Sequence, residues 1–322
     1  MDTNSFPQGR PDAAQDAVLV GIDGSDQSRH ALERALVEAR ARGAAVRLVG
    51  AYPVIAVGDP DLELRFTEAV TRENVEHLTE ARGVVEAAGL PVEVVEAPGD
   101  AAKAIVERSA EAALVVMGKR GRGGTLRGRL GSVSAAVAAH ARCPVVVVPE
   151  VAEEPHAERR GGTDYALEAG GPVEAGGIDF TGRVVVGLDA LGARNPALWQ
   201  AVGYARDHGR TLTLVSVNGA LSGTPAWFQD AFDQTRYFRE ADRQLTGIAQ
   251  EIAAQHPELT VERHIFVGRP ARILMDVTRS ADLVVVGSRG IGGFRGLLMG
   301  SVSQAVLENA AGPVMVVPAR TD

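Results

Sequence analysis

Residues 118–149 read GKRGRGGTLRGRLGSVSAAVAAHARCPVVVVP, and residues 287–318 read GSRGIGGFRGLLMGSVSQAVLENAAGPVMVVP. Laid over each other at an offset of 169, the two stretches match at 17 of 32 positions without a gap. The shared glycines, the Gly-Ser pair and the closing Pro-Val-x-Val-Val-Pro keep their spacing in both stretches. A repeat of this length predicts two copies of one domain, each with its own copy of one site.

Composition narrows the class of protein. The chain has 322 residues, 45% of them hydrophobic, and a net charge of −8, which argues against binding to nucleic acid. No stretch approaches the roughly 18 apolar residues of a membrane span, and the polar N-terminus lacks the apolar core of a signal peptide. We therefore expect a soluble, cytoplasmic protein without a membrane partner. The single cysteine, Cys143, rules out an intrachain disulfide, and we interpret it as a small buried hydrophobe rather than a nucleophile.

Short apolar runs alternate with amphipathic segments in both copies. Strands are expected at 17–22, 46–51, 92–95, 114–117 and 145–148, and again at 184–188, 212–217, 261–266, 283–286 and 314–317. Helices are expected at about 28–42, 61–88, 101–112 and 132–141, and at about 196–208 and 226–255. This order predicts an α/β fold of two tandem, doubly wound, five-stranded parallel sheets.

The same pattern divides the chain into domains. Residues 17–150 and 183–319 are predicted to form the two domains, after a disordered tail at 1–16. Residues 151–182 are rich in Glu, Gly, Ala and Arg, so we interpret them as a plain linker. The runs at 145–148 and 314–317 lie at sheet edges, and exposed apolar edges favour pairing. The two halves are therefore expected to pair about a pseudo-twofold axis within the chain.

A glycine-rich loop joins the fourth strand of each copy to the last helix. In open parallel sheets, ligands bind at this end of the strands. Gly118 and Gly121 allow the backbone to approach a ligand closely, and Gly131 with Ser132 opens the helix, whose amides and dipole favour phosphate. The patterns GxxxxGK[ST] and GxGxxG are both absent from this position, so the loop belongs to neither standard phosphate-binding class.

An aspartate follows the first strand in each copy: Asp23 in VGIDGS and Asp189 in VGLDAL. Such a carboxylate can accept hydrogen bonds from a ribose hydroxyl or a base amino group. The alternative is that each aspartate merely caps the following helix. The presence of the glycine loop in both copies favours the role in ligand binding.

Together these features resemble the universal stress protein family in its tandem, two-domain form. The family motif is Gly, two residues, Gly, nine residues, then Gly-Ser or Gly-Thr. The chain has it at Gly118, Gly121 and Gly131-Ser132, and again at Gly287, Gly290 and Gly300-Ser301. The Val-Gly-x-Asp-Gly-Ser ending of the family's first strand matches residues 20–25. The resemblance implies a Rossmann-like, adenine nucleotide alpha hydrolase-like fold that binds ATP, with or without magnesium, and is not a committed enzyme.

The resemblance also implies the residues of two nucleotide pockets. In the first domain these are Gly21, Ile22, Asp23, Ala51, Met117, Gly118, Gly121, Gly131, Ser132 and Val133. In the second they are Gly187, Leu188, Asp189, Val217, Val286, Gly287, Gly290, Gly300, Ser301 and Val302. The second copy departs from the pattern because Ala190 and Leu191 follow its aspartate, which puts its occupancy in doubt.

The two glycine loops differ in charge. The first carries Lys119, Arg120, Arg122, Arg127 and Arg129, whereas the second carries Arg289 and Arg295. One interpretation is a solvated basic loop. We favour charge complementarity to a triphosphate, so the first domain should hold phosphate better.

No motif supplies a catalytic residue or a set of metal ligands, which favours binding over fast phosphoryl transfer. Three functions remain, in this order: a nucleotide-dependent regulator of the stress response, a slow ATPase or phosphotransferase that uses the same pockets, and a structural tandem domain with one vestigial pocket. As partners we expect an adenine nucleotide, a second chain in a homodimer and a regulatory protein.

Overall fold

The computed structural model describes most of the two repeats. The described residues are 17–54, 56–122, 130–150, 165–168, 171–174, 177–189, 192–218, 234–289 and 299–319. The predicted tail at 1–16 and the predicted helical residues 226–233 lie outside these ranges.

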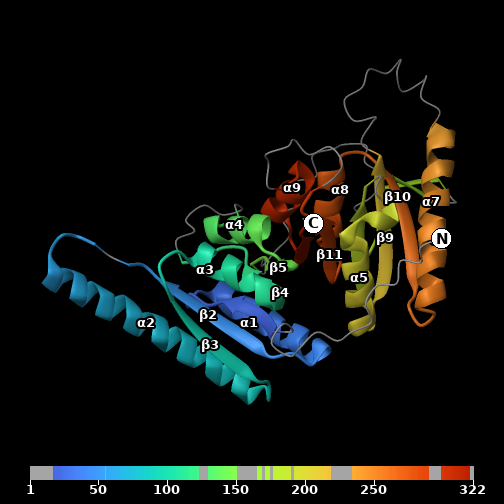
Figure 1. Ribbon diagram of the computed structural model, residues 1–322. Helices are drawn as coiled ribbons and strands as arrows, with labels where there is room; N and C mark the ends of the chain where they lie inside the picture. The colour runs from blue at the N-terminus through green and yellow to red at the C-terminus, as the bar shows by residue number, and fades with distance from the viewer. Residues whose placement is uncertain are drawn as a thin grey trace, which may run out of the picture.

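The first half alternates strands and helices in the expected order (Figure 1). Its elements are β1 (Ala17–Gly21), α1 (Asp26–Arg42), β2 (Val46–Tyr52), α2 (Pro60–Ala87), β3 (Val92–Pro98), α3 (Ala101–Arg108), β4 (Ala112–Gly118), α4 (Ser132–His140) and β5 (Val145–Val148). The helix expected at 101–112 is shorter than predicted, because a 3-10 turn at Ser109–Glu111 follows α3 and β4 already begins at Ala112.

The second half repeats this order. Its elements are β8 (Arg183–Leu188), a 3-10 turn (Gly192–Arg194), α5 (Pro196–Asp207), β9 (Thr211–Asn218), α7 (Gln234–Gln255), β10 (Val261–Val267), α8 (Pro270–Val277), β11 (Leu283–Gly287), α9 (Ser301–Asn309) and β12 (Val314–Val317).

The strands form one sheet in the order β3-β2-β1-β4-β5-β12-β11-β8-β9-β10-β6-β7. All neighbours within each five-stranded half are parallel, and the two halves meet where β5 pairs with β12 in the antiparallel direction. Val146 lies opposite Met315 at this junction, and both are fully buried. The predicted pairing of the two apolar edges is confirmed, and the antiparallel junction relates the halves by a pseudo-twofold axis.

Helices cover both faces of the sheet (Figure 1). Successive side chains of a strand point to opposite faces, so Val18 and Val20 pack with α1 and α2 in one core, whereas Leu19 packs with α3 and α4 in the other. Strands buried on both faces read as continuous apolar runs, which is why the valine-rich segments were recognisable in the sequence. In the first half, the chain connections diverge to opposite faces of the sheet between β1 and β4. In the second half, they diverge between β8 and β11.

The segment 151–182 is not the plain linker that its composition indicated. It contains β6 (Tyr165–Glu168) and β7 (Gly171–Glu174), a hairpin that adds to the edge of the second half by antiparallel pairing of β6 with β10. Phe180, which follows the hairpin, is fully buried, and its amide donates to Ser280 Oγ at 3.0 Å. This segment therefore belongs in part to the second domain.

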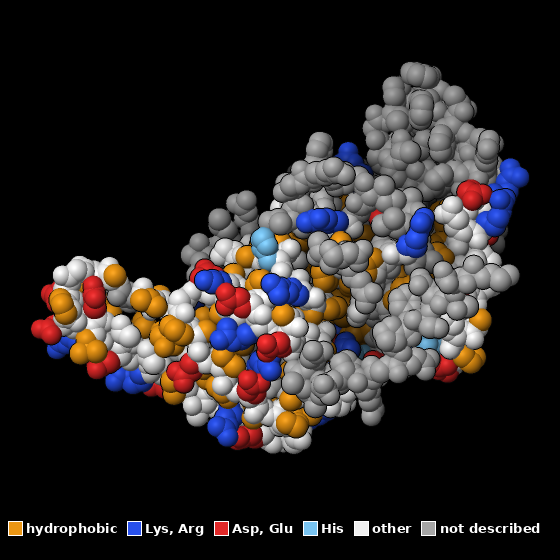
Figure 2. Space-filling view, viewed as in Figure 1, with side chains coloured by type: hydrophobic (Ala, Val, Ile, Leu, Met, Phe, Trp, Pro, Cys, Tyr) orange, Lys and Arg blue, Asp and Glu red, His pale blue; other side chains and the backbone are white. Residues whose placement is uncertain are grey.

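Helix α2 is the longest helix among the described residues, with 28 residues, and its first half projects beyond the sheet (Figures 1 and 2). Its buried residues begin only at Asn74 and continue to Val85. Several apolar side chains before that point are exposed, and Figure 2 shows hydrophobic side chains on this projecting arm; they include Leu62, Leu64 and Phe66.

Candidate functional site: a cavity at the carboxyl ends of the strands

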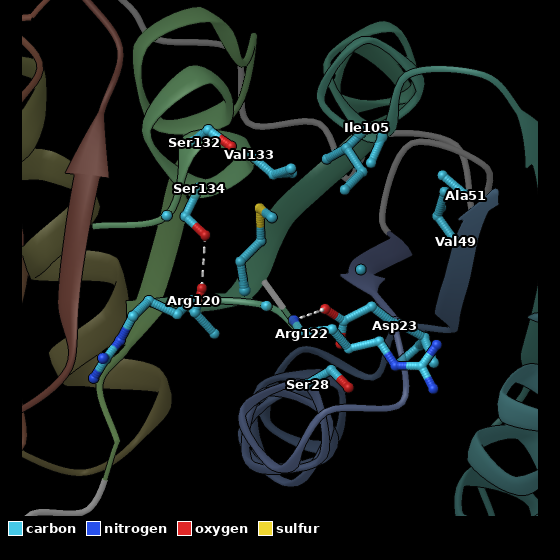
Figure 3. Close-up of a pocket in the computed structure, with 17 residues that line it drawn as sticks. Asp23, Ser28, Val49, Ala51, Ile105, Arg120, Arg122, Ser132, Val133 and Ser134 are labelled. Atoms are coloured by element: carbon cyan, nitrogen blue, oxygen red, sulfur yellow. Dashed lines mark hydrogen bonds between the residues drawn. The ribbon is translucent and has the colours of Figure 1, made fainter. Parts of the chain in front are cut away.

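A cavity of about 350 Å³ opens at the carboxyl ends of β1, β2 and β4 (Figure 3). The structure brings all ten residues expected for the first pocket to its wall: Gly21, Ile22, Asp23, Ala51, Met117, Gly118, Gly121, Gly131, Ser132 and Val133. They come from three strands, the loop after β1, the glycine loop and the start of α4, so they come together only in the folded chain.

The carboxylate of Asp23 ties the end of β1 to the glycine loop. Its Oδ1 accepts hydrogen bonds from the amide and hydroxyl of Ser25, at 3.0 and 2.6 Å, and its Oδ2 accepts one from the Arg122 amide at 3.1 Å. Ser25, not Asp23, caps α1, because its hydroxyl accepts from the Ser28 amide at 3.2 Å. The alternative in which Asp23 merely caps the following helix is therefore wrong.

Two glycines of the motif lie so close to neighbouring atoms that a side chain would displace those atoms. A Cβ on Gly118 would lie 2.8 Å from the backbone oxygen of Gln27, and a Cβ on Gly121 would lie 2.4 Å from Asp23 Oδ2. Distances below 3.0 Å force neighbouring atoms to move. The motif spacing thus lets the loop lie directly against the start of α1 and against Asp23.

Helix α4 begins at the cavity. Its N-cap residue is Gly131, whose amide donates to the Lys119 carbonyl at 2.9 Å, and none of the described side chains caps this helix. Ser132 is exposed at the cavity wall, while the Ser134 hydroxyl donates to the Gly118 carbonyl at 2.8 Å (Figure 3). The amides of the first turn therefore face an accessible space at the positive end of the helix dipole.

The wall also includes Arg120 and Arg122, two of the basic residues expected near a triphosphate. Sequence reasoning missed five further wall residues, of which two are polar (Ser28 and Ser134) and three are apolar (Val49, Ala101 and Ile105). The repeated Ser-x-Ser of both copies was a signal for Ser134. Val49 lies two residues before Ala51, on the same face of β2. Nothing in the sequence marked Ala101 or Ile105, since α3 carries no motif.

The basic residues of the first loop have different surroundings. Arg120 pairs with Glu150 at 2.9 Å, and its side chain turns away from the cavity (Figure 3). Lys119 is buried, and burial lowers the pKa of its amine to about 8, with the charge of Arg120 acting in the same direction and that of Glu308 opposing it. Arg122 extends past Asp23 and pairs with Glu73 of α2 at 2.6 Å. Arg127 and Arg129 lie outside the described residues.

The second half places the described members of its expected set in the corresponding positions. Gly187, Leu188, Asp189 and Val217 lie at or just after the ends of β8 and β9, Val286 and Gly287 end β11, and Gly300, Ser301 and Val302 start α9. Gly290, Ala190, Leu191 and Arg295 lie outside the described residues.

Two hydrogen bonds of the first loop recur in the second half. The Ser303 hydroxyl donates to the Gly287 carbonyl at 2.6 Å, and the Gly300 amide donates to the Ser288 carbonyl at 2.7 Å. Here Asn195 caps α5 and donates to Asp189 Oδ1 at 3.3 Å, so Asp189 is not the helix cap either.

The described residues contain no helix long and apolar enough to cross a membrane. They also contain no group of three or more His, Cys, Asp or Glu side chains arranged to hold a metal ion.

Comparison with known proteins agrees with the repeated fold. The model of the universal stress protein family matches residues 16–149 and 181–318. The chain therefore belongs to the universal stress protein family. Universal stress protein Rv1996 of Mycobacterium tuberculosis is 32% identical over 93% of this chain and 94% of its own length. A universal stress protein of Mycolicibacterium smegmatis is 30% identical over 96% of this chain and 99% of its own.

A solved structure supports the fold along the whole chain. The crystal structure of a universal stress protein from Archaeoglobus fulgidus DSM 4304 superposes with a TM-score of 0.63 at 22% identity. It covers 95% of this chain and 97% of its own. The tandem arrangement of two Rossmann-like domains is thus shared over nearly the full length of both chains.

Proposed function

We propose that the chain binds ATP in the cavity of its first domain and acts as a nucleotide-dependent regulator of the stress response rather than as a fast enzyme. The observation that carries this proposal is the convergence on one cavity of all ten residues that the family resemblance implied. Its volume of about 350 Å³ lies within the range of small-molecule sites, which starts near 300 Å³.

The start of α4 is the proposed phosphate site. Among the described residues, α4 and α9 begin at glycines without a side-chain cap. Helix α8 also begins without a side-chain cap, at Arg269, whereas four other helices have an N-cap side chain that accepts from their first amides: Ser25, Asp59, Asp100 and Asn195. Uncapped amides at a helix N-terminus, next to a glycine loop, favour an anionic ligand such as phosphate.

The remainder of the cavity suits an adenosine. Ala51, Ile105 and Met117 supply apolar wall, which favours a flat aromatic base. Asp23 is the one carboxylate among the described wall residues, and it can accept a hydrogen bond from a ribose hydroxyl or a base amino group. The apolar part of the wall thus suits the base of a nucleotide, and the polar part suits its ribose and phosphates.

We infer that the second domain binds nucleotide less tightly. Its loop carries two arginines where the first carries five basic residues, and Ala190 and Leu191 replace Gly24 and Ser25 after the aspartate. Regulation requires only that nucleotide bind one conformation of the chain better than another. A cytoplasmic location, a homodimer of tandem chains and a regulatory protein partner complete the proposal.

Isothermal titration calorimetry with ATP tests the proposal in matched variants. Ser132→Glu places a carboxylate at the start of α4, where it repels phosphate but suits the helix dipole, so folding should be preserved. Ser301→Glu makes the same change in the second domain. We expect Ser132→Glu to remove the tighter binding event and Ser301→Glu the weaker one. Binding of ATP that neither variant alters would contradict the proposed phosphate sites.

The alternative function is a slow ATPase or phosphotransferase, and the position of Asp23 in the cavity wall is the observation that favours it. A hydrolysis assay separates it from pure binding. Turnover above the background rate that is lost in Asp23→Asn, while ATP still binds, would support the enzyme; binding without turnover supports the regulator.

A further inference from the structure

We propose that Arg122 is a phosphate-binding residue of the first pocket, and that Glu73 of α2 holds its guanidinium in the nucleotide-free chain and sets the pocket's affinity for phosphorylated ligands. This inference rests on the proposed function, because it assigns a charge switch to the same cavity. The experiment below distinguishes its failure from failure of nucleotide binding.

Among the basic loop residues that the structure describes, Arg122 differs from Lys119 and Arg120 in where its side chain lies. It lines the cavity, and its amide is fixed to Asp23 Oδ2 at 3.1 Å, so the residue is anchored at the wall by its backbone. Its side chain extends past Asp23 (Figure 3), and its Nη2 donates to Glu73 Oε1 at 2.6 Å. Arg120 turns away toward Glu150, and the Lys119 side chain is buried.

The ion pair that holds Arg122 is an exchangeable one. Both side chains are about half exposed, 48% for Arg122 and 49% for Glu73. The hydrogen bond from Arg122 and its charge keep the pKa of the Glu73 carboxyl below its usual range, so the glutamate is ionised at neutral pH. Exposed pairs of this kind contribute little stability, whereas a guanidinium binds phosphate through charge-assisted hydrogen bonds. A polyphosphate with more than one negative charge therefore competes effectively with Glu73 for Arg122.

The two halves of the chain differ at this point. The residue that corresponds to Arg122 in the second copy of the repeat is Ile291, which has no charge. The glutamate–arginine switch is therefore a property of the first domain, and it gives that pocket a preference for phosphorylated ligands beyond what the shared glycine motif supplies.

The proposal is tested by measuring the affinity of the full chain for ATP and for adenosine, with Ser301→Glu present to leave only the first pocket. Glu73→Gln should tighten ATP binding about two- to fivefold, because Arg122 is released. Arg122→Gln should weaken it about tenfold. Adenosine affinity should change little in either variant. The matched controls are Glu76→Gln and Arg72→Gln, exposed residues of α2 with the same loss of charge, and they should leave ATP affinity nearly unchanged.

The double variant Glu73→Gln with Arg122→Gln is decisive. If Glu73 acts through Arg122, the double variant should bind ATP as Arg122→Gln alone does. An equal gain from Glu73→Gln with or without Arg122, or a gain that Glu76→Gln reproduces, would overturn the switch and leave a general effect of charge. Failure of the unmodified chain to bind any nucleotide would overturn both the switch and the proposed function.

Discussion

The phenol of Tyr204 in the second domain donates a 2.8 Å hydrogen bond to the carboxylate of Glu38 in the first. Glu38 is fully buried, and its Oε1 also accepts from Arg34 Nε at 2.7 Å, so the carboxylate joins α1 to α5 across the two halves. The ring of Tyr204 stacks on His208 with centroids 3.9 Å apart. The halves are therefore held together by this polar cluster as well as by the β5–β12 pair.

Removing the Tyr204 hydroxyl should destabilise the chain. Tyr204→Phe keeps the ring but leaves a buried carboxylate with one donor fewer, which we expect to lower the free energy of unfolding by about 1–3 kcal/mol. Urea denaturation followed by circular dichroism measures the change. Tyr52→Phe is the matched control, at the end of β2, and should cost less than about 0.5 kcal/mol. Equal losses in the two variants would show that the hydroxyl of Tyr204 contributes nothing special.

Lys119 should destabilise the chain at neutral pH. The pKa of a free lysine is near 10.4, and burial lowers that of Lys119 to about 8, so the unfolded chain binds more protons between these values. The buried amine therefore lowers the free energy of unfolding by its full amount below pH 8. This loss disappears as the pH rises toward 10. We expect Lys119→Met to raise the free energy of unfolding by about 1–3 kcal/mol at pH 7 and by clearly less near pH 10.

The control for this pH dependence is Lys103→Met, because the Lys103 side chain is 75% exposed. It should leave the urea midpoint nearly unchanged at both pH values. A gain from Lys119→Met that does not depend on pH would mean that packing, not the buried charge, is responsible.

Cys143 should be chemically silent in the folded chain. The thiol is buried, and burial raises its pKa to about 12, so almost no thiolate is present at pH 8. We expect no reaction with Ellman's reagent in buffer at pH 8 and complete reaction in concentrated urea. Rapid labelling of the folded chain would contradict the interpretation of Cys143 as a buried hydrophobe.

Two glycines should respond to alanine in opposite directions. Gly24 has φ +78°, and a Cβ there would lie 2.5 Å from the ring of His77, so Gly24→Ala should cost about 1–3 kcal/mol. Gly83 lies inside α2 with open space around it, so Gly83→Ala should add about 0.5–1 kcal/mol. Thermal denaturation of both variants checks the pair, and a Gly24→Ala variant as stable as the parent would refute the strained geometry.

Much of the fold was readable because the strands are buried on both faces. The valine runs at Val145–Val148 and Val314–Val317 were predicted with the bounds that the structure has. Helix ends were less accurate where no cap or apolar pattern marked them, as in the 3-10 turn after α3. The β6–β7 hairpin was missed because its polar, glycine-rich composition is also typical of a linker, and its pairing with β10 is a tertiary contact.

The site residues, too, were predictable only where a sequence motif marks them. The residues that a repeated motif marks, such as Gly118 and Ser132, line the cavity as expected. Ala101 and Ile105 were missed because α3 reaches the cavity only through the fold. The partnership of Arg122 with Glu73 was likewise invisible, because it joins residues 49 positions apart on separate elements.

Whether the two glycine loops hold nucleotide is tested by identifying and counting the nucleotides that the purified chain carries. The purified chain is denatured and the released nucleotides are identified by chromatography, beside Gly118→Ala and Gly287→Ala, with Gly83→Ala as the control for folding. A Cβ on Gly118 would meet Gln27 at 2.8 Å and one on Gly287 would meet Arg289 at 3.2 Å, so each variant disturbs one loop. We predict that the parent chain and Gly83→Ala release ATP. Gly118→Ala and Gly287→Ala should each lack the nucleotide that is bound in the altered pocket. A parent chain that releases no nucleotide, and binds none when ATP is added back, would show that the two glycine loops do not hold nucleotide.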